Sequence, residues 1–242
     1  MEEMIRLIAY FFLLAILAIF VIRAKKLAAQ NTDNTSMLKK TSDRYLNKII
    51  GQWFITTIIF LIYGSFQVLI SPLNILTGLN PQIKITLMLL SFIFAVASMF
   101  PVILSWLNES RRRSLLISIR EIPYPLPQTK KEALLYTLVG VTTGFGEELM
   151  YRGFLIRLLV DLPFGINSLQ SLVIISILFG LAHFYQGIGG MIMTCLFGLS
   201  MGVIFFITGN LLVPILLHTI IFLRFFLIPG FYKEFVLREN KI

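Results

Sequence analysis

The sequence has few of the residues that form the surface and the redox sites of soluble enzymes. Only 14% of its 242 residues are charged, and it contains one cysteine and two histidines. The single cysteine, Cys195, excludes an intramolecular disulfide and a thiolate metal cluster. The shortage of charged residues argues against a water-soluble globular protein, because the surface of such a protein needs many polar side chains.

Apolar residues take the place of the missing charges. Hydrophobic residues make up 57% of the chain, against about 45–50% in ordinary soluble proteins. A chain of this length cannot bury so many apolar side chains, since much of its surface stays exposed after folding. We therefore predict an all-α fold, a polytopic transmembrane helical bundle in which the lipid bilayer is the solvent for the outer face.

Seven apolar segments predict seven transmembrane helices, and a split or half-inserted segment would raise the number to eight. A helix needs about 20 apolar residues to cross a bilayer. The predicted spans are 4–22, 49–70, 85–107, a helix from about 131 through 159, 171–185, 189–207 and 211–228.

The net charge of +9 is concentrated in the connections and the tail. Basic residues follow the first and third spans and occur in the C-terminal tail. The connections 71–84 and 161–170 together contain only one basic residue, Lys84. Because basic loops stay on the cytoplasmic side, we expect a multi-pass protein of the cell (inner or plasma) membrane with a cytoplasmic C-terminus. We expect no nucleic-acid partner. The basic connections contain Arg23, Lys25, Lys26, Lys39, Lys40, Arg44 and Lys48, then Arg111, Arg112, Arg113, Arg120, Lys130 and Lys131.

A proline-rich stretch divides the chain. Residues 122–128 contain three prolines and cannot form a regular helix. We predict that residues 1–128 form membrane-anchoring helices with basic cytoplasmic loops, and that residues 129–242 form a helical core that carries the functional site.

Ionisable residues inside predicted spans are candidates for function, because such groups are costly in lipid. Glu147 and Glu148 lie midway along the fourth segment, and His183 and His218 lie in two later apolar segments. Glu148 and Arg152 are four residues apart on one helix face, so we expect a supporting ion pair. Glu147 is turned by about 100° from Glu148 and is assigned to the chemistry.

A carboxylate and an imidazole around one water molecule form a general-base site. A second histidine can polarise the scissile carbonyl or hold the oxyanion. The set Glu147, His183 and His218 could also bind zinc with an open coordination position, as in a metalloprotease. The spacing His-Glu-x-x-His is absent, so the sequence requires no cofactor and leaves zinc possible.

The order of these residues resembles the CPBP intramembrane proteases. That family contains the type II CAAX prenyl endopeptidases and the bacterial Abi proteins linked to bacteriocin immunity. The resemblance extends from about residue 131 to residue 222. It rests on Glu147-Glu148-x-x-x-Arg152, on Phe179-x-x-x-His183, and on Asn210-Leu211 leading to His218.

The resemblance implies a helical membrane bundle with a cavity at the catalytic glutamate. It assigns Glu147 as the base that activates water, His183 as the group that orients this water, and His218 as the oxyanion stabiliser. The residues that would support or shape the site are Glu148, Arg152 and Phe179. The chain departs from the family pattern at Phe222, where an asparagine usually follows the last histidine.

Three functions are compatible with these residues. The first is an intramembrane endopeptidase of the CAAX-protease/Abi type, acting on a peptide or membrane-protein substrate. The second is a non-catalytic immunity or regulatory protein that binds a partner in the same cavity, which Phe222 favours. The third is a proton-coupled transporter, because buried glutamates and histidines also form proton relays. We rank it last, since we find no paired inverted halves with interrupted helices.

Overall fold

The computed structural model describes residues 37–63, 78–120 and 126–236. All regular structure in these residues is helical, so the predicted all-α class is confirmed. The predicted first span, 4–22, lies outside the described residues.

The first described helix, α2, begins earlier than the sequence predicted. It runs from Met37 to Tyr63, whereas the prediction placed a basic loop up to residue 48 and a span over 49–70. Residues 64–70 lie outside the described part of the chain. Basic residues indicate the side of the membrane but not the backbone conformation, and here several of them occupy a helix.

The predicted third span, 85–107, is broken into two helices. These are α4 (Pro81–Ala97) and α5 (Phe100–Leu107), which meet at an angle of 50°. Pro101 lies in the first turn of α5, and a proline has no N–H to continue the hydrogen-bond ladder of the preceding helix. The next helix, α6 (Glu109–Arg120), lies in what was predicted as a basic loop.

The predicted helix over 131–159 is confirmed. It consists of α7 (Lys130–Glu148), the π-helical segment η1 (Leu149–Leu155) and α8 (Ile156–Asp161). The side chain of Thr129 caps its start by accepting a hydrogen bond from the Glu132 N–H. The Glu132 carboxylate accepts one from the Gln128 N–H, and together these bonds satisfy backbone donors that a helix start leaves unpaired.

The last three predicted spans also form helices. They are α9 (Ser168–Ala182), α10 (Gly187–Thr208) and α11 (Leu212–Phe222), with short segments η2 (Phe184–Gln186), η3 (Leu223–Leu227) and η4 (Tyr232–Val236). Asn167 and Gln170 form a capping box at the start of α9. Gly209, with φ of 65°, ends α10 in the left-handed conformation that favours glycine.

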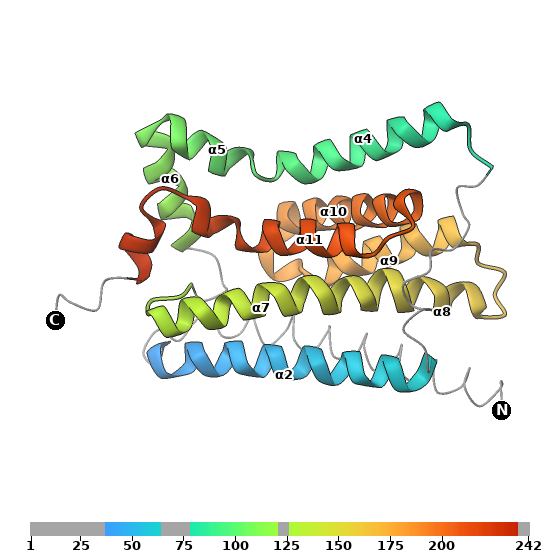
Figure 1. The fold of residues 1–242 in the computed structure, drawn as a ribbon, viewed down its shortest axis with the longest axis horizontal. Coiled ribbons are helices and arrows are strands. Elements are labelled where there is room, and N and C mark those ends of the chain that lie inside the picture. The colour runs from blue at the N-terminus through green and yellow to red at the C-terminus, as the bar shows by residue number, and fades with distance from the viewer. Residues whose placement is uncertain (1–36, 64–77, 121–125, 237–242) are drawn as a thin grey trace.

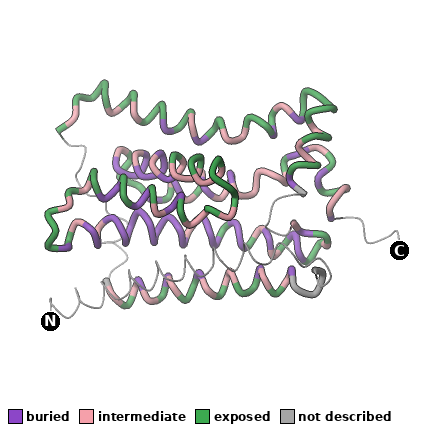
Figure 2. The backbone as a smooth tube through the Cα atoms, turned by 180° about the vertical axis from the view of Figure 1, so that it is seen from behind, coloured by how far each residue is buried: buried purple, intermediate pink, exposed green. Residues whose placement is uncertain are grey.

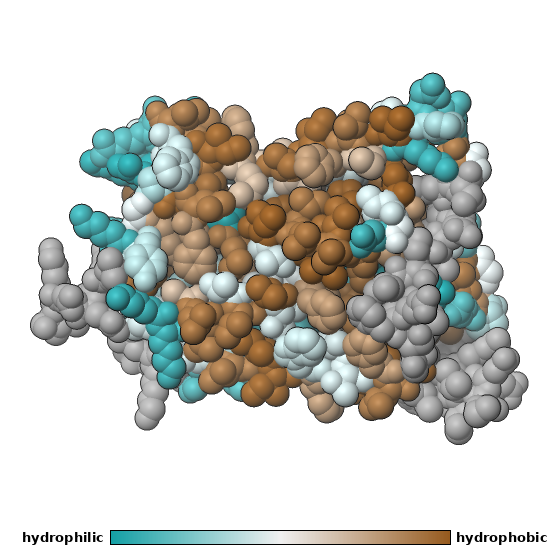
Figure 3. Space-filling view, viewed as in Figure 1, coloured by the Kyte–Doolittle hydropathy of each residue, from teal (hydrophilic) through white to brown (hydrophobic). Residues whose placement is uncertain are grey.

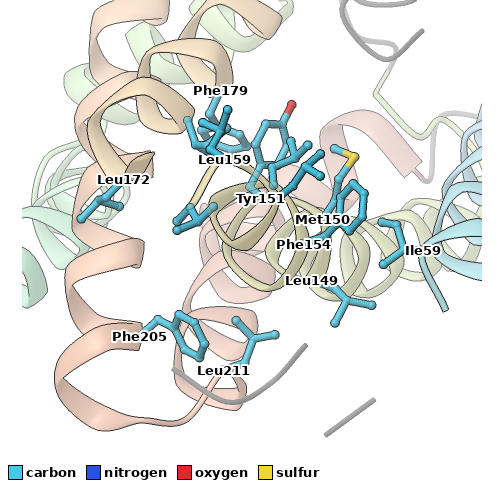
Figure 4. Packing of buried hydrophobic residues seen from close by; sticks show 14 of the residues in the cluster. Ile59, Leu149, Met150, Tyr151, Phe154, Leu159, Leu172, Phe179, Phe205 and Leu211 are labelled. Atoms are coloured by element: carbon cyan, nitrogen blue, oxygen red, sulfur yellow. The ribbon is translucent and has the colours of Figure 1, made fainter. Parts of the chain in front are cut away.

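The helices lie roughly side by side along the long axis of the molecule, with α2 against α7 and α9 against α10 (Figure 1). The α11 helix packs on α7, and α4 packs on α10. The α7–η1 stretch is mostly buried, whereas α4 is largely exposed (Figure 2). The main core cluster gathers around η1, with Tyr151 and Phe179 in contact (Figure 4).

The surface has the character of a membrane protein. Hydrophobic side chains cover the middle of the face in Figure 3, and hydrophilic ones gather toward the two ends. Among the described residues, Thr41–Ile62 and Phe184–Thr208 are long and apolar enough to cross a membrane, and the bent α4–α5 pair would make a third. The predicted count of seven to eight spans is therefore not confirmed. The α9 helix has 15 residues, and α7 carries charged residues at both ends.

Candidate functional site

A cavity of about 370 Å³ is lined by residues of α2, α4, α7, α9, α10 and α11. Glu147 of α7, His183 at the C-terminal cap of α9 and His218 of α11 all line it. Phe179, Phe222 and Lys48 of α2 line the same space. The structure thus brings together the three residues that the sequence singled out for chemistry, from three separate helices.

Glu148 is at the centre of a buried polar network. Its Oε1 accepts hydrogen bonds from Nη1 of Arg152 at 2.9 Å and from Nδ1 of His218 at 2.8 Å. Nη2 of Arg152 donates to the carbonyl oxygen of Gly198 at 2.9 Å. Glu148 and Arg152 are 0% and 3% exposed, so the pair is shielded from water. The predicted ion pair is present, and Glu148 also fixes the ring of His218.

Glu147 faces the cavity. Its Oε1 lies 3.6 Å from Nζ of Lys48, and its Oε2 lies 3.9 Å from Nε2 of His218. Oε2 is buried and has no hydrogen-bond partner within the described part of the chain. A buried carboxylate oxygen needs a donor, and a water molecule or a substrate group in the cavity would supply one.

The hydrogen bonds of the two histidines define which ring nitrogen points to the cavity. Nδ1 of His183 lies 2.8 Å from the carbonyl oxygen of Phe179. Both this carbonyl and the Glu148 carboxylate are acceptors, so Nδ1 of each histidine is the donor. In the neutral ring, Nε2 of His183 and of His218 is then an acceptor. Nε2 of His183 can accept a hydrogen bond from a bound water, whereas Nε2 of His218 donates a hydrogen bond only when the ring carries two protons.

Phe179 holds these groups in place through its ring. The ring centroid lies 4.8 Å from that of His183 and 6.1 Å from that of His218, the latter in an edge-to-face arrangement. The guanidinium of Arg152 lies 4.9 Å from the Phe179 ring centroid, within the range of a cation–π contact. Phe179 therefore contacts both histidines and the cation of the network.

Sequence reasoning missed three contributors to the site. Lys48 was placed in a basic loop, but it lies on α2 and contacts Glu147. Phe197 of α10 packs edge-to-face against His218 with centroids 5.3 Å apart. Gly198 of α10 accepts a hydrogen bond from Arg152 through its carbonyl oxygen. The partner of each of these residues lies far away in the sequence, so no local pattern indicates the contact.

The zinc interpretation has no support from the geometry of the described residues. Among them, no group of three or more histidine, cysteine, aspartate or glutamate side chains is arranged to hold a metal ion. Zinc ligands lie about 2.0–2.3 Å from the metal and surround it tetrahedrally. A zinc ion on Glu147, His183 and His218 remains a hypothesis from the sequence.

Comparison with protein families identifies the segment that carries the site. Residues 129–223 match the family described as Type II CAAX prenyl endopeptidase Rce1-like. The matched segment contains Glu147, Glu148, Arg152, His183 and His218. Searches of curated proteins and of solved structures give no match. The family match supports the resemblance and points to a protease: through residues 129–223, this chain is similar to the type II CAAX prenyl endopeptidases.

Proposed function

We propose that the protein is an intramembrane endopeptidase of the CAAX-protease type that hydrolyses a bond in a peptide or membrane-protein substrate. The observation that carries the proposal is the Glu147 carboxylate, whose unpartnered Oε2 lies at the wall of a cavity shared with His183 and His218. The family match supports the same class of reaction.

In the proposed reaction, Glu147 takes a proton from a water molecule that His183 holds through Nε2. The water oxygen bonds to the scissile carbonyl carbon, and the π-electron pair of the carbonyl moves to its oxygen. His218 in its doubly protonated form stabilises this oxyanion. The pair then returns, the C–N bond breaks, and the leaving nitrogen takes the proton from Glu147. One water is consumed, and a carboxylic acid and an amine are formed.

We also propose roles for the surrounding groups and a location. Glu148 and Arg152 orient His218, because Glu148 accepts from its Nδ1. Phe179 fixes the positions of the His183 and His218 rings by packing against both of them. The distribution of basic residues supports a multi-pass protein of the cell membrane with a cytoplasmic C-terminus.

The test is a cleavage assay of the purified protein on a peptide library, with the variant Glu147→Gln. Gln cannot take a proton from water, so we expect the rate to fall by about 10²–10⁴-fold, the usual contribution of a general base. The matched control is Glu109→Gln in α6, which removes a carboxylate that pairs with Arg113 on the exposed surface. We expect this control to cleave at the wild-type rate.

Cleavage by clean Glu147→Gln protein at the wild-type rate would contradict the proposal. A chelator added to the wild-type assay separates the two versions of the mechanism, because only a zinc-dependent enzyme loses activity on metal removal. A non-catalytic immunity or regulatory protein would show no cleavage in the wild type and would keep its biological effect in the variant.

A further inference from the structure

We propose that Lys48 is a further catalytic residue, whose ammonium donates a hydrogen bond to the oxyanion formed at the scissile carbonyl. This inference rests on the proposed peptidase function. Lys48 lies on α2, outside the family-matched segment 129–223. The assignment makes α2 a part of the active site.

The position of Lys48 carries the first step of the argument. Its side chain lines the cavity together with Glu147, His183 and His218. Nζ lies 3.6 Å from Oε1 of Glu147, longer than the 2.7–3.2 Å of a protein hydrogen bond. An ammonium has three N–H donors, so Lys48 can contact Glu147 and a second acceptor in the cavity at the same time.

The hydrogen bonds of the histidines show why a further donor matters. In their neutral forms, both His183 and His218 present an acceptor nitrogen to the cavity, because their Nδ1 atoms donate to Phe179 and Glu148. A developing oxyanion needs donors at 2.7–3.1 Å. The Lys48 ammonium has three N–H donors, so it can supply this donor whichever ring nitrogens the histidines present.

The surroundings of Phe222 point to the same assignment. Phe222 stands where the family pattern has an asparagine, and phenylalanine offers no hydrogen-bond donor. The ammonium of Lys48 lies 5.9 Å from the centroid of the Phe222 ring, and both side chains line the cavity. The Phe222 ring itself packs against Tyr136, with centroids 5.1 Å apart. A cation from α2 thus lies next to the position that lacks the polar side chain.

The proposed step leaves the balance of the reaction unchanged. When the water oxygen bonds to the carbonyl carbon, the carbonyl π pair moves to the oxygen, which then accepts a hydrogen bond from Nζ of Lys48. Lys48 keeps its proton throughout. When the C–N bond breaks, the pair returns to the carbonyl and the hydrogen bond weakens. Lys48 therefore acts on the transition state and raises kcat.

The competing explanation makes Lys48 only a counter-ion that keeps Glu147 ionised and the helices together. In that case, removing Lys48 lowers stability, and a polar side chain at position 222 restores nothing. As an oxyanion donor, Lys48 affects kcat with little change in KM, and an asparagine at position 222 compensates for its loss. The two roles therefore differ in whether Phe222→Asn restores activity to a Lys48 variant, and in whether the loss of Lys48 lowers kcat with little change in KM.

The experiment measures kcat and KM of full-length Lys48→Met, Lys48→Gln and the double variant Lys48→Met/Phe222→Asn on a peptide that the wild type cleaves. Loss of one oxyanion donor lowers kcat by about 10²–10³-fold, so we expect this fall in Lys48→Met and a smaller one in Lys48→Gln, whose amide still has N–H donors. We expect the double variant to recover at least about tenfold of it. The matched control is Arg44→Met, one turn earlier on α2 and outside the cavity lining, which should keep wild-type kcat.

Wild-type kcat in Lys48→Met would overturn the proposal, as would a loss in this variant that Phe222→Asn does not reduce. Failure of both single variants to accumulate in membranes would assign Lys48 to folding and would also overturn it. Glu147→Gln, assayed in parallel, separates the two levels of inference. If Glu147→Gln is inactive while the Lys48 variants are not impaired, the peptidase function stands and the role of Lys48 is rejected.

Discussion

Two neighbouring carboxylates of α7 lie in contrasting surroundings. Glu148 is fully buried, and one of its oxygens accepts hydrogen bonds from Arg152 and His218. Glu147 lines a cavity, its nearest charged groups lie 3.6 and 3.9 Å away, and one of its oxygens has no partner among the described residues. The comparison teaches that the number of fixed donors around a carboxylate separates a structural role from a chemical one. The Glu148 carboxylate is held by protein donors, whereas the Glu147 carboxylate faces a cavity that a ligand can enter.

The largest expected effect comes from Arg152→Leu, which removes the cation that pairs with Glu148. This change leaves Glu148 buried without its cation, which costs about 3–5 kcal/mol of unfolding free energy. Thermal unfolding of detergent-purified protein, together with its accumulation in membranes, measures the effect. The matched control is Arg111→Leu on the exposed face of α6, with an expected change within about 0.5 kcal/mol.

A double variant sharpens this prediction. In Glu148→Leu/Arg152→Leu no buried charge of the pair is left alone, so we expect most of the lost stability to return. His218 loses its Nδ1 partner in the same variant, so cleavage should stay impaired. A double variant no more stable than Arg152→Leu would show that the pair is not the source of the loss.

A smaller effect is expected from Gly144→Ala, which acts on the contact between α7 and α11. An added Cβ would collide with Oγ1 of Thr219 and lie 3.1 Å from both the Ile215 carbonyl oxygen and the Thr219 backbone nitrogen. Because backbone atoms cannot turn aside, we expect a loss of about 1–3 kcal/mol in unfolding free energy. The displacement would also move His218, which lies on α11, so cleavage should fall.

Gly51→Ala on α2 is the matched control for Gly144→Ala. A Cβ at Gly51 meets no atom within 4 Å, and alanine is a better helix former than glycine by about 1 kcal/mol. Thermal unfolding should show no loss of stability for Gly51→Ala. Equal effects of the two substitutions would contradict the tight α7–α11 contact.

The smallest effect is expected from Thr143→Val in the cavity that Glu147 lines. Thr143 lies one turn before Glu147 and lines the cavity, and its buried hydroxyl has no partner within the described residues. Valine has nearly the same shape, so we expect unfolding free energy to stay within about 0.5 kcal/mol of wild type. If the hydroxyl contacts water or substrate, kcat/KM should fall by about threefold to tenfold, the equivalent of one neutral hydrogen bond.

Ser171→Ala is the control for Thr143→Val. Ser171 is 0% exposed, its hydroxyl also has no partner among the described residues, and it does not line the cavity. We expect wild-type kcat/KM for this variant. A Thr143→Val protein that loses stability and keeps its kcat/KM would place the hydroxyl in the packing of the bundle instead.

The sequence predicted the helices of the C-terminal part well, because long apolar runs with clear caps are local signals. The Glu148–Arg152 pair is local too, since its members lie on one helical face. The meeting of Glu147, His183 and His218 depends on how three helices pack. It was indicated by the cost of ionisable groups in apolar segments and by the family resemblance, and not by local spacing. Charge composition misled the prediction for α2, where basic residues suggested a loop. The role of Lys48 could not be predicted, since its partner is distant in the sequence.

The predicted span count is not confirmed for a related reason. Hydropathy identifies apolar stretches, but a bend or a short helix decides whether a stretch crosses the bilayer as one rod. Pro101 carried a signal for the break between α4 and α5 that the hydropathy pattern alone did not include. The described helices of fewer than 18 residues, such as α9 and α11, likewise fall short of a full crossing by length.

The π-helical segment η1 has a consequence for how the site could change during evolution. A π turn takes in about one residue more than an α turn, so it rotates everything after it by about 100° relative to a regular helix. Arg152, Phe154 and Leu155 lie inside this wide turn and are all buried. Deleting a single residue there would restore an ordinary helix and leave Glu147 where it is, but it would rotate α8 (Ile156–Asp161) to a different face. The length of η1 therefore sets which face of α8 packs against the bundle. This length is constrained even where the side chains of η1 can be exchanged.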